Sequence, residues 1–150
     1  YHQTIAEHGS FLYLNQEFFE TLCRTMPAQV RLLLARRGER DVAAAFFICA
    51  DSALYGRYWG SVEQIPDLHF EVCYYTPIEY CIEQGFPIFE AGAQGEHKLS
   101  RGLMPTITRS AHWLSHTGFH DAIQRYTREE QQEIERYTDI LEQHSPFKRT

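Results

Sequence analysis

The sequence predicts an α+β fold in which a mixed, mostly antiparallel sheet is flanked by helices. Two strand-like runs, at about residues 29–36 and 42–50, are joined by a turn at residues 38–41, and so short a connection predicts an antiparallel hairpin. A helical crossover separates the first three strands from a fourth at residues 87–91, which lets that strand lie parallel to the third. A length of 150 residues suits one domain with its own core.

The first elements are expected to be helical. Residues 1–7 read as a short helical piece that stops at Gly9. Apolar residues then recur at helical spacing, and they predict a helix at about residues 15–25 that ends before Pro27.

The next two strands follow from apolar content. Residues 42–50 are nearly all apolar, as in a strand buried on both faces. A third strand is predicted at residues 54–59 and is closed by Gly60.

The crossover is predicted to be a broken helix. Asp67 is a suitable N-cap for its first piece. The quartet Thr76-Pro77-Ile78-Glu79 has the pattern of a capping box with proline at the first helical position, so we expect a break at Thr76. Gly85 is expected to end the second piece.

Three elements are predicted beyond the fourth strand. Residues 95–101 should form one or two helical turns, and residues 106–114 alternate like a strand. A long helix is expected at about residues 119–143, with an apolar stripe on one side and charged residues on the other.

Composition excludes several classes of protein. A net charge of −6 argues against a general nucleic-acid coat. No stretch approaches the ~20 apolar residues that a membrane span needs. The four cysteines lack metal-type spacing and are expected to be reduced and buried, as in a cytoplasmic protein. They are Cys23, Cys49, Cys73 and Cys81.

One polar stretch, residues 89–102, stands out as a candidate site. Three glycines in it allow close approach of the backbone to a ligand, and Glu96, His97 and Lys98 follow each other between them. Because lysine and glutamate are seldom buried unless paired, these residues indicate either the polar floor of a cleft or a solvated loop.

The order of elements resembles the GNAT acyltransferase fold. In that fold a central helix ends in glycine, a strand follows, then a short helix ending in glycine, and then another strand; residues 78–85, 88–91 and 97–102 fit the first three parts. Users of acetyl-coenzyme A in that fold carry a glycine-rich pyrophosphate loop before the central helix. Residues 60–67 occupy that place with one glycine and two acids, which argues against acyl-coenzyme A as the donor.

The chain resembles more closely the FemAB-like proteins of peptidoglycan biosynthesis or recognition. Four separated blocks carry the resemblance: LYGRYWG (54–60), LHFEVCYY (68–75), FEAGAQGEHK (89–98) and HSPF (144–147). The resemblance implies a GNAT-like lobe, here the C-terminal part of a longer two-lobe protein with Thr4 in the remnant of an entry helix. It also implies partners: a missing N-terminal lobe or a second copy, and a small-molecule or cell-wall-precursor substrate.

Three functions are compatible with this resemblance. The first is transfer of an acyl or aminoacyl group to an amine, for example in a peptidoglycan precursor, with an unidentified cofactor or donor for which aminoacyl-tRNA is a candidate. The second is recognition of a cell-wall precursor or a protein without catalysis. The third is a lobe that only completes its partner lobe, because fold alone does not settle function.

Transfer to an amine requires proton removal, oxyanion stabilisation and positioning of both substrates. The resemblance implies Lys98 for charge stabilisation, with His97, Glu96 and Glu71 as further catalytic candidates. The substrate-binding candidates are Arg57, Tyr58, Trp59, Glu90 and Gln94. We expect Glu90 and residues 94–98 to border one concave surface, with Glu71 and Tyr58 across it and a carboxylate paired with Lys98.

Three histidines recur every four residues, at positions 112, 116 and 120, which on a helix would suggest a metal site. Thr117-Gly118 falls between them and His112 sits in a strand-like run, so no metal site is predicted.

Overall fold

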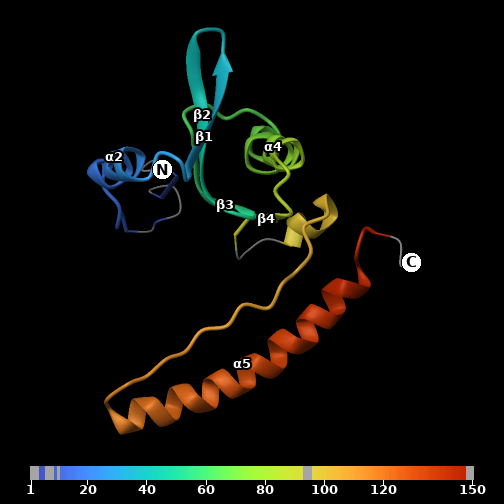
Figure 1. Ribbon diagram of the computed structural model, residues 1–150. Coiled ribbons are helices and arrows are strands. Elements are labelled where there is room, and N and C mark those ends of the chain that lie inside the picture. Colours follow the sequence, from blue (N-terminus) through green and yellow to red (C-terminus); the bar gives the residue numbers. More distant parts are fainter. Residues whose placement is uncertain (1–3, 6–8, 10, 93–95, 148–150) are drawn as a thin grey trace. The chain divides into compact units, whose positions relative to one another are not determined.

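The chain divides into two compact units. The computed structural model in Figure 1 describes residues 4, 5, 9, 11–92 and 96–147. The first unit comprises residues 1–93 and the second residues 94–150, and each is described by itself. Of the N-terminal helical piece predicted at residues 1–7, the described residues Thr4 and Ile5 are helical and the others lie outside the described part of the chain.

The first unit is built on a four-stranded mixed sheet in the order β1-β2-β3-β4. Strands β1 (Val30–Arg37), β2 (Arg40–Ala50) and β3 (Ala53–Ser61) are antiparallel, whereas β4 (Ile88–Glu90) runs parallel to β3. The pairing of Arg37 with Arg40 leaves a two-residue turn, with Gly38 at a φ of 61° that glycine adopts readily. Both the hairpin and the parallel fourth strand are therefore confirmed.

One face of the sheet, which we call the α4 face, carries the main core. Alternate residues of β2 and β3 point to it and meet the crossover helix. The core cluster consists of Ala45, Phe47, Cys49, Leu54, Val72 and Cys81. Leu54 is the most deeply buried large side chain, at 1% exposure.

The opposite face, which we call the α2 face, is covered in part by α2 (Gln16–Thr25). Asn15 caps this helix by accepting a hydrogen bond from the Phe18 N–H at 2.9 Å. Phe19 of α2 packs edge-on against Phe46 and Tyr58, with ring centroids 5.5 and 5.8 Å apart. Figure 1 shows α2 and α4 on opposite sides of the sheet.

The crossover helix differs from the prediction. It runs as α3 (Leu68–Phe70), a π-helical turn η1 (Glu71–Tyr75) and α4 (Thr76–Gln84) without leaving the helical path. The predicted capping box is wrong, because Thr76 has helical φ and ψ and its hydroxyl donates to Glu71 at 2.7 Å. The π turn, in which the Thr76 N–H bonds the Glu71 carbonyl, accommodates a proline that lacks an N–H and crowds the carbonyl four residues earlier.

The ends of the crossover helix are glycine and aspartate as expected, but only one caps conventionally. Gly85 adopts a left-handed φ of 70° and donates its N–H to the carbonyls of Cys81 and Ile82. Asp67 stands before the first helical residue with a φ of 61°, and its side chain makes no capping hydrogen bond.

The described residues of the second unit, 96–147, include a short and a long helix. The predicted short helix is the 3₁₀ helix η2 (Glu96–Arg101), and the long helix is α5 (Thr117–Gln143). The strand predicted at residues 106–114 is wrong, since residues 103–114 form no regular element. Alternation alone does not make a strand, because its backbone groups need a neighbouring strand to bond.

The cysteines are all free thiols, and their burial corrects one expectation. Cys49 and Cys81 are buried and Cys73 is half-buried, but Cys23 on α2 is exposed. Among the described residues, no helix is long and apolar enough to cross a membrane.

Candidate functional site

A β-bulge in β3 positions the first candidate residue. Phe46 pairs with Tyr58 while the adjacent Phe47 pairs with Gly56, so Arg57 is an extra residue between two ladder pairs. Bulges redirect side chains and are common beside active sites. The parallel pairing of β3 with β4 ends just before this bulge, at Tyr55 and Glu90.

Arg57 and Glu90 meet at this point. Arg57 Nη1 lies 3.7 Å from Glu90 Oε1, and both side chains are about half exposed, at 43% and 51%. The guanidinium carbon also lies 5.3 Å from the centre of the Tyr55 ring, which is a cation–π distance. Two of the predicted binding residues are thus brought together, with a tyrosine that sequence reasoning did not select.

Gly56 of β3 lies beside the end of β4. A β-carbon added to Gly56 would lie 3.6 Å from the Glu90 carbonyl oxygen and 3.7 Å from the Cα of Ala91. These are ordinary contact distances, so the backbone at the end of β4 runs directly beside Gly56, and an alanine would also fit there.

Tyr58 lies on the α2 face, next to an open groove between α2 and the sheet. Its hydroxyl is 3.5 Å from the hydroxyl of Tyr13. The part of the groove beside Tyr58 has a volume of about 210 Å³. The larger part has a volume of about 480 Å³ and reaches Ser61 and Val62 at the end of β3.

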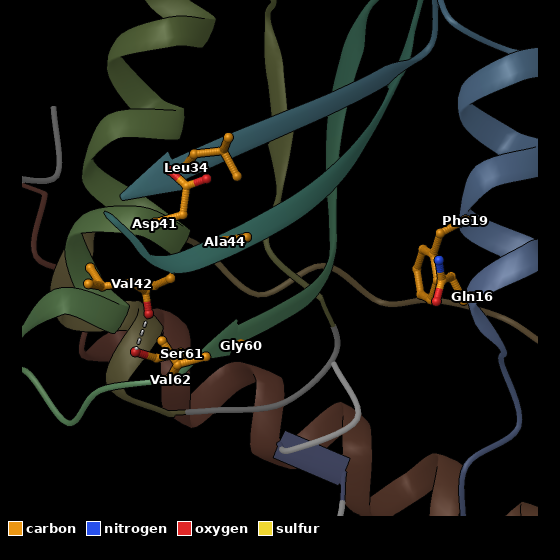
Figure 2. A pocket seen from close by; sticks show the side chains of 10 residues that line it. Gln16, Phe19, Leu34, Asp41, Val42, Ala44, Gly60, Ser61 and Val62 are labelled. Carbon is orange, nitrogen blue, oxygen red and sulfur yellow. Dashed lines mark hydrogen bonds between the residues drawn. The ribbon is translucent and has the colours of Figure 1, made fainter. Parts of the chain in front are cut away.

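Small residues form the floor of this groove. Figure 2 shows Gln16 and Phe19 projecting from α2 toward strands that carry Leu34, Ala44 and Gly60. The dashed line in Figure 2 is the hydrogen bond that the Ser61 hydroxyl donates to the Val42 carbonyl, at 3.0 Å. The lining is mainly apolar, so the groove suits an apolar part of a ligand.

Trp59 and Glu71 belong to the other side of the sheet. Trp59 packs against the core cluster, and its ring lies 4.9 Å from that of His69. Glu71 is in η1, whose residue Val72 joins the same core. The structure therefore brings Arg57, Tyr58 and Glu90 to one region of the α2 face but does not bring Glu71 to it. Trp59 packs against the core and also borders the part of the groove beside Tyr58.

The remaining candidates are in or near η2 of the second unit. His97 is exposed and Lys98 is half-buried. The His97 carbonyl accepts hydrogen bonds from Ser100 Oγ at 2.8 Å and Arg101 Nη1 at 2.7 Å, which stiffen this short helix. Gln94 and the side chain of Glu96 lie outside the described part of the chain, so the concave surface expected around residues 90–98 stays a prediction.

Two sequence blocks that are far apart meet at the end of η2. Gly102 follows η2 with a φ of 81°, and a β-carbon there would lie 2.9 Å from Phe147 Cζ. Ser145 donates its hydroxyl to the Met104 sulfur at 3.6 Å and accepts the Phe147 N–H at 3.2 Å. The C-terminal residues 144–147 therefore pack against the residues that end the Lys98-bearing helix.

The three regularly spaced histidines do not share a helix face. His116 caps α5 by accepting the Phe119 N–H at 3.4 Å, and His112 Nε2 pairs with the Ser110 hydroxyl at 2.9 Å outside the helix. Among the described residues, no group of three or more histidine, cysteine or acidic side chains is arranged to hold a metal ion.

Sequence reasoning missed Tyr55, Tyr13 and the groove. The signal for Tyr55 was its place two residues before Arg57, because alternate residues of a strand share a face. The groove could not be predicted from the sequence, because it depends on the small floor residues Ala44 and Gly60 becoming neighbours across two strands.

Comparison with known proteins identifies a family. A protein-family model described as FemAB-like, peptidoglycan biosynthesis/recognition, matches residues 1–149. No curated protein matches the chain. No solved structure matches it either.

Proposed function

Because the chain belongs to the FemAB-like family of peptidoglycan biosynthesis and recognition, we propose that it is a GNAT-like transferase lobe acting on a peptidoglycan precursor. The transferred group is an acyl or aminoacyl group and the acceptor is an amine. The observation that carries the proposal is the family match over residues 1–149. The parallel β3–β4 pair that follows the crossover helix supports the fold assignment.

The chemistry divides among the candidate residues by role. Lys98 stabilises the negative charge that develops on the carbonyl oxygen during transfer. His97 is the preferred proton acceptor for the amine because a neutral imidazole nitrogen can take up a proton, with Glu96 and Glu71 as the other candidates. Arg57, Tyr58 and Gln94 bind the substrate, and Glu90 lies at the same place as the ion-pair partner of Arg57.

Aminoacyl-tRNA is the donor that we favour over acyl-coenzyme A. The residues before the crossover helix include Glu63, which Arg37 holds at 2.8 Å, and Asp67, which adopts a left-handed backbone conformation. A pyrophosphate site needs several aligned backbone N–H groups and no nearby carboxylate, whereas this loop carries two carboxylates.

The test combines transfer and binding measurements on the full chain. Mass spectrometry would follow addition of an amino acid, or of an acetyl group, to a precursor peptide with a free side-chain amine. Lys98→Ala should abolish transfer while the peptide still binds, and Lys98→Arg should restore part of the activity because the charge remains. Unchanged transfer by Lys98→Ala would refute the assignment of this residue.

The second candidate function is recognition without catalysis. The groove on the α2 face and the Arg57–Glu90 pair form a binding surface within the first unit, without Lys98 and the rest of η2. A recognition lobe would bind the precursor peptide and transfer nothing, alone or with a partner lobe. Tyr58→Ala would then weaken binding while Lys98→Ala would change nothing measurable.

A further inference from the structure

We propose that Arg57 is the receptor for a carboxylate group of the substrate, and that Glu90 occupies this receptor when no substrate is bound. The inference rests on the proposed function, in which the first unit binds the precursor. It adds the chemical group that is recognised and an internal competitor for it.

The Arg57 guanidinium has polar partners, but within the described chain these do not use all of its hydrogen-bond donors. Its recorded polar contacts within the described chain come from one nitrogen, Nη1, to Glu90 Oε1 at 3.7 Å and to the Gly56 carbonyl at 3.5 Å. Charge-assisted hydrogen bonds are usually ~2.8 Å long, and a guanidinium has five N–H donors in a planar fork. The planar guanidinium can therefore still bind a second carboxylate that is better aligned with it.

The local backbone explains why Arg57 is oriented for this role. As the extra residue of a bulge it is not constrained by a cross-strand pair, and the Tyr55 ring supports the guanidinium at 5.3 Å. Arginine that stacks on an aromatic ring while presenting its edge is suited to planar anions.

Glu90 is placed to compete with a substrate carboxylate for Arg57 and to be displaced by it. Its backbone is fixed by the last ladder pair of β4 with Tyr55, whereas its side chain is about half exposed. Ion pairs this exposed contribute little stability, so a substrate carboxylate that aligns better with the guanidinium can displace it at small cost.

The surroundings favour a carboxylate over a phosphate. A phosphate dianion would meet the Glu90 charge with one guanidinium to offset it, whereas a carboxylate brings a single charge. The apolar groove begins beside Arg57, at Tyr58, and Ala44 and Gly60 form its floor. A peptide carboxylate flanked by small apolar side chains fits both features.

The experiment uses N-acetyl-dialanine with a free C-terminal carboxylate as the probe, and its C-terminal amide as the neutral counterpart. Binding to the full chain is followed by NMR shifts of the backbone amides at residues 56–58. Wild-type protein should prefer the acid. Arg57→Gln should weaken binding of the acid at least about tenfold, because hydrogen bonds between charged groups are the strong ones.

The decisive variant is Glu90→Gln, which removes the competitor and retains the shape. It should tighten binding of the acid by about threefold to fivefold, in line with the small worth of an exposed ion pair, and leave binding of the amide unchanged. Arg40→Gln is the matched control, because the exposed Arg40 pairs with Glu63 on the same sheet, neither residue lines the groove, and the change should not affect binding. Thermal unfolding of each variant confirms that it folds.

Three outcomes overturn the inference: equal binding of acid and amide, weaker or unchanged binding of the acid to Glu90→Gln, and tighter binding of inorganic phosphate than of the acid. Loss of amino-acid transfer does not enter this test. If the wild-type chain transfers nothing but the Glu90→Gln gain is observed, the transferase proposal fails and the carboxylate receptor stands.

Discussion

The contact between Gly102 and Phe147 gives the sharpest prediction about how the Lys98-bearing helix is held. Replacing Gly102 by alanine places a β-carbon 2.9 Å from Phe147 Cζ, and it also puts an L-residue at a φ of 81°. The change therefore has two costs, one from the backbone and one from the displaced ring.

The two costs can be estimated separately. A left-handed backbone costs an L-residue about 1–2 kcal/mol. The Phe147 ring is 60% exposed, so moving it forfeits less than half of the ~1.5–3 kcal/mol that full burial of a phenylalanine contributes, or about 1 kcal/mol. Gly102→Ala should therefore cost about 2–3 kcal/mol in total, and Phe147→Ala alone about 1 kcal/mol.

Gly85→Ala is the control for the backbone cost, because Gly85 has a φ of 70° and an added β-carbon would meet nothing within 4 Å. Urea unfolding should show a smaller loss for Gly85→Ala than for Gly102→Ala. In the double variant the Gly102 and Phe147 losses should fall about 1 kcal/mol short of additive, since the ring contact is lost only once.

Amide exchange gives a local readout of the same contact. The Leu103 N–H bonds the Lys98 carbonyl at 3.2 Å, and it should exchange faster in both the Gly102→Ala and Phe147→Ala variants. Strictly additive losses with unchanged exchange at Leu103 would refute the reasoning, because the Phe147 ring would then not support the end of η2.

Three further predictions concern the first unit. Leu54→Ala should cost about 2–5 kcal/mol in urea unfolding, because it empties the most buried position, and a loss below 1 kcal/mol would mean that the core collapses around it. Tyr80→Phe should cost about 0.5–1.5 kcal/mol by removing the 2.9 Å hydrogen bond that Arg31 Nε donates to the hydroxyl; no loss would show that water replaces it equally well. Burial raises the pKa of the Cys81 thiol, so its contribution to stability is complete below the unfolded pKa of about 8.5 and is lost as pH rises through the folded pKa. Alkylation mapping at pH 8 should accordingly label exposed Cys23 well before Cys81, and equal rates would contradict this.

The strands of the first unit and the helices α2 and α5 were predictable because local pattern and tertiary environment agree. The apolar run at residues 42–50 does become a strand covered on both faces, by α2 and by the crossover helix. The turn at Gly38 needs only two residues, which leaves an antiparallel hairpin as the natural arrangement. Asn15 caps its helix as its side chain favours.

The features that sequence pattern missed depend on non-local partners. A proline signals disturbed helical hydrogen bonding, but whether the chain leaves the helix or widens into a π turn at Pro77 is decided by packing of η1 against the sheet. Residues 106–114 alternate suitably but no strand in the described chain pairs with them.

The bulge at Arg57 decides which face of the sheet the neighbouring candidate side chains reach. Strict alternation would put Arg57 and Trp59 on the same face, and the inserted residue changes this, so that Arg57 joins Tyr58 on the α2 face while Trp59 enters the core. Sequence reasoning selected Arg57, Tyr58 and Glu90 as substrate-binding candidates but could not assign the face of the sheet on which each one lies, and their binding role stays a prediction.

The short parallel ladder between β3 and β4 has a consequence for folding kinetics. The β1–β2–β3 meander closes through short loops, whereas β4 must return across the whole crossover helix to make three residue pairs. We therefore expect the meander to form first, and β4 to dock late and to open first under native conditions. Arg57 would then be in place before Glu90 arrives. In a newly made chain its guanidinium would therefore have no carboxylate partner from β4 until the crossover between β3 and β4 has folded.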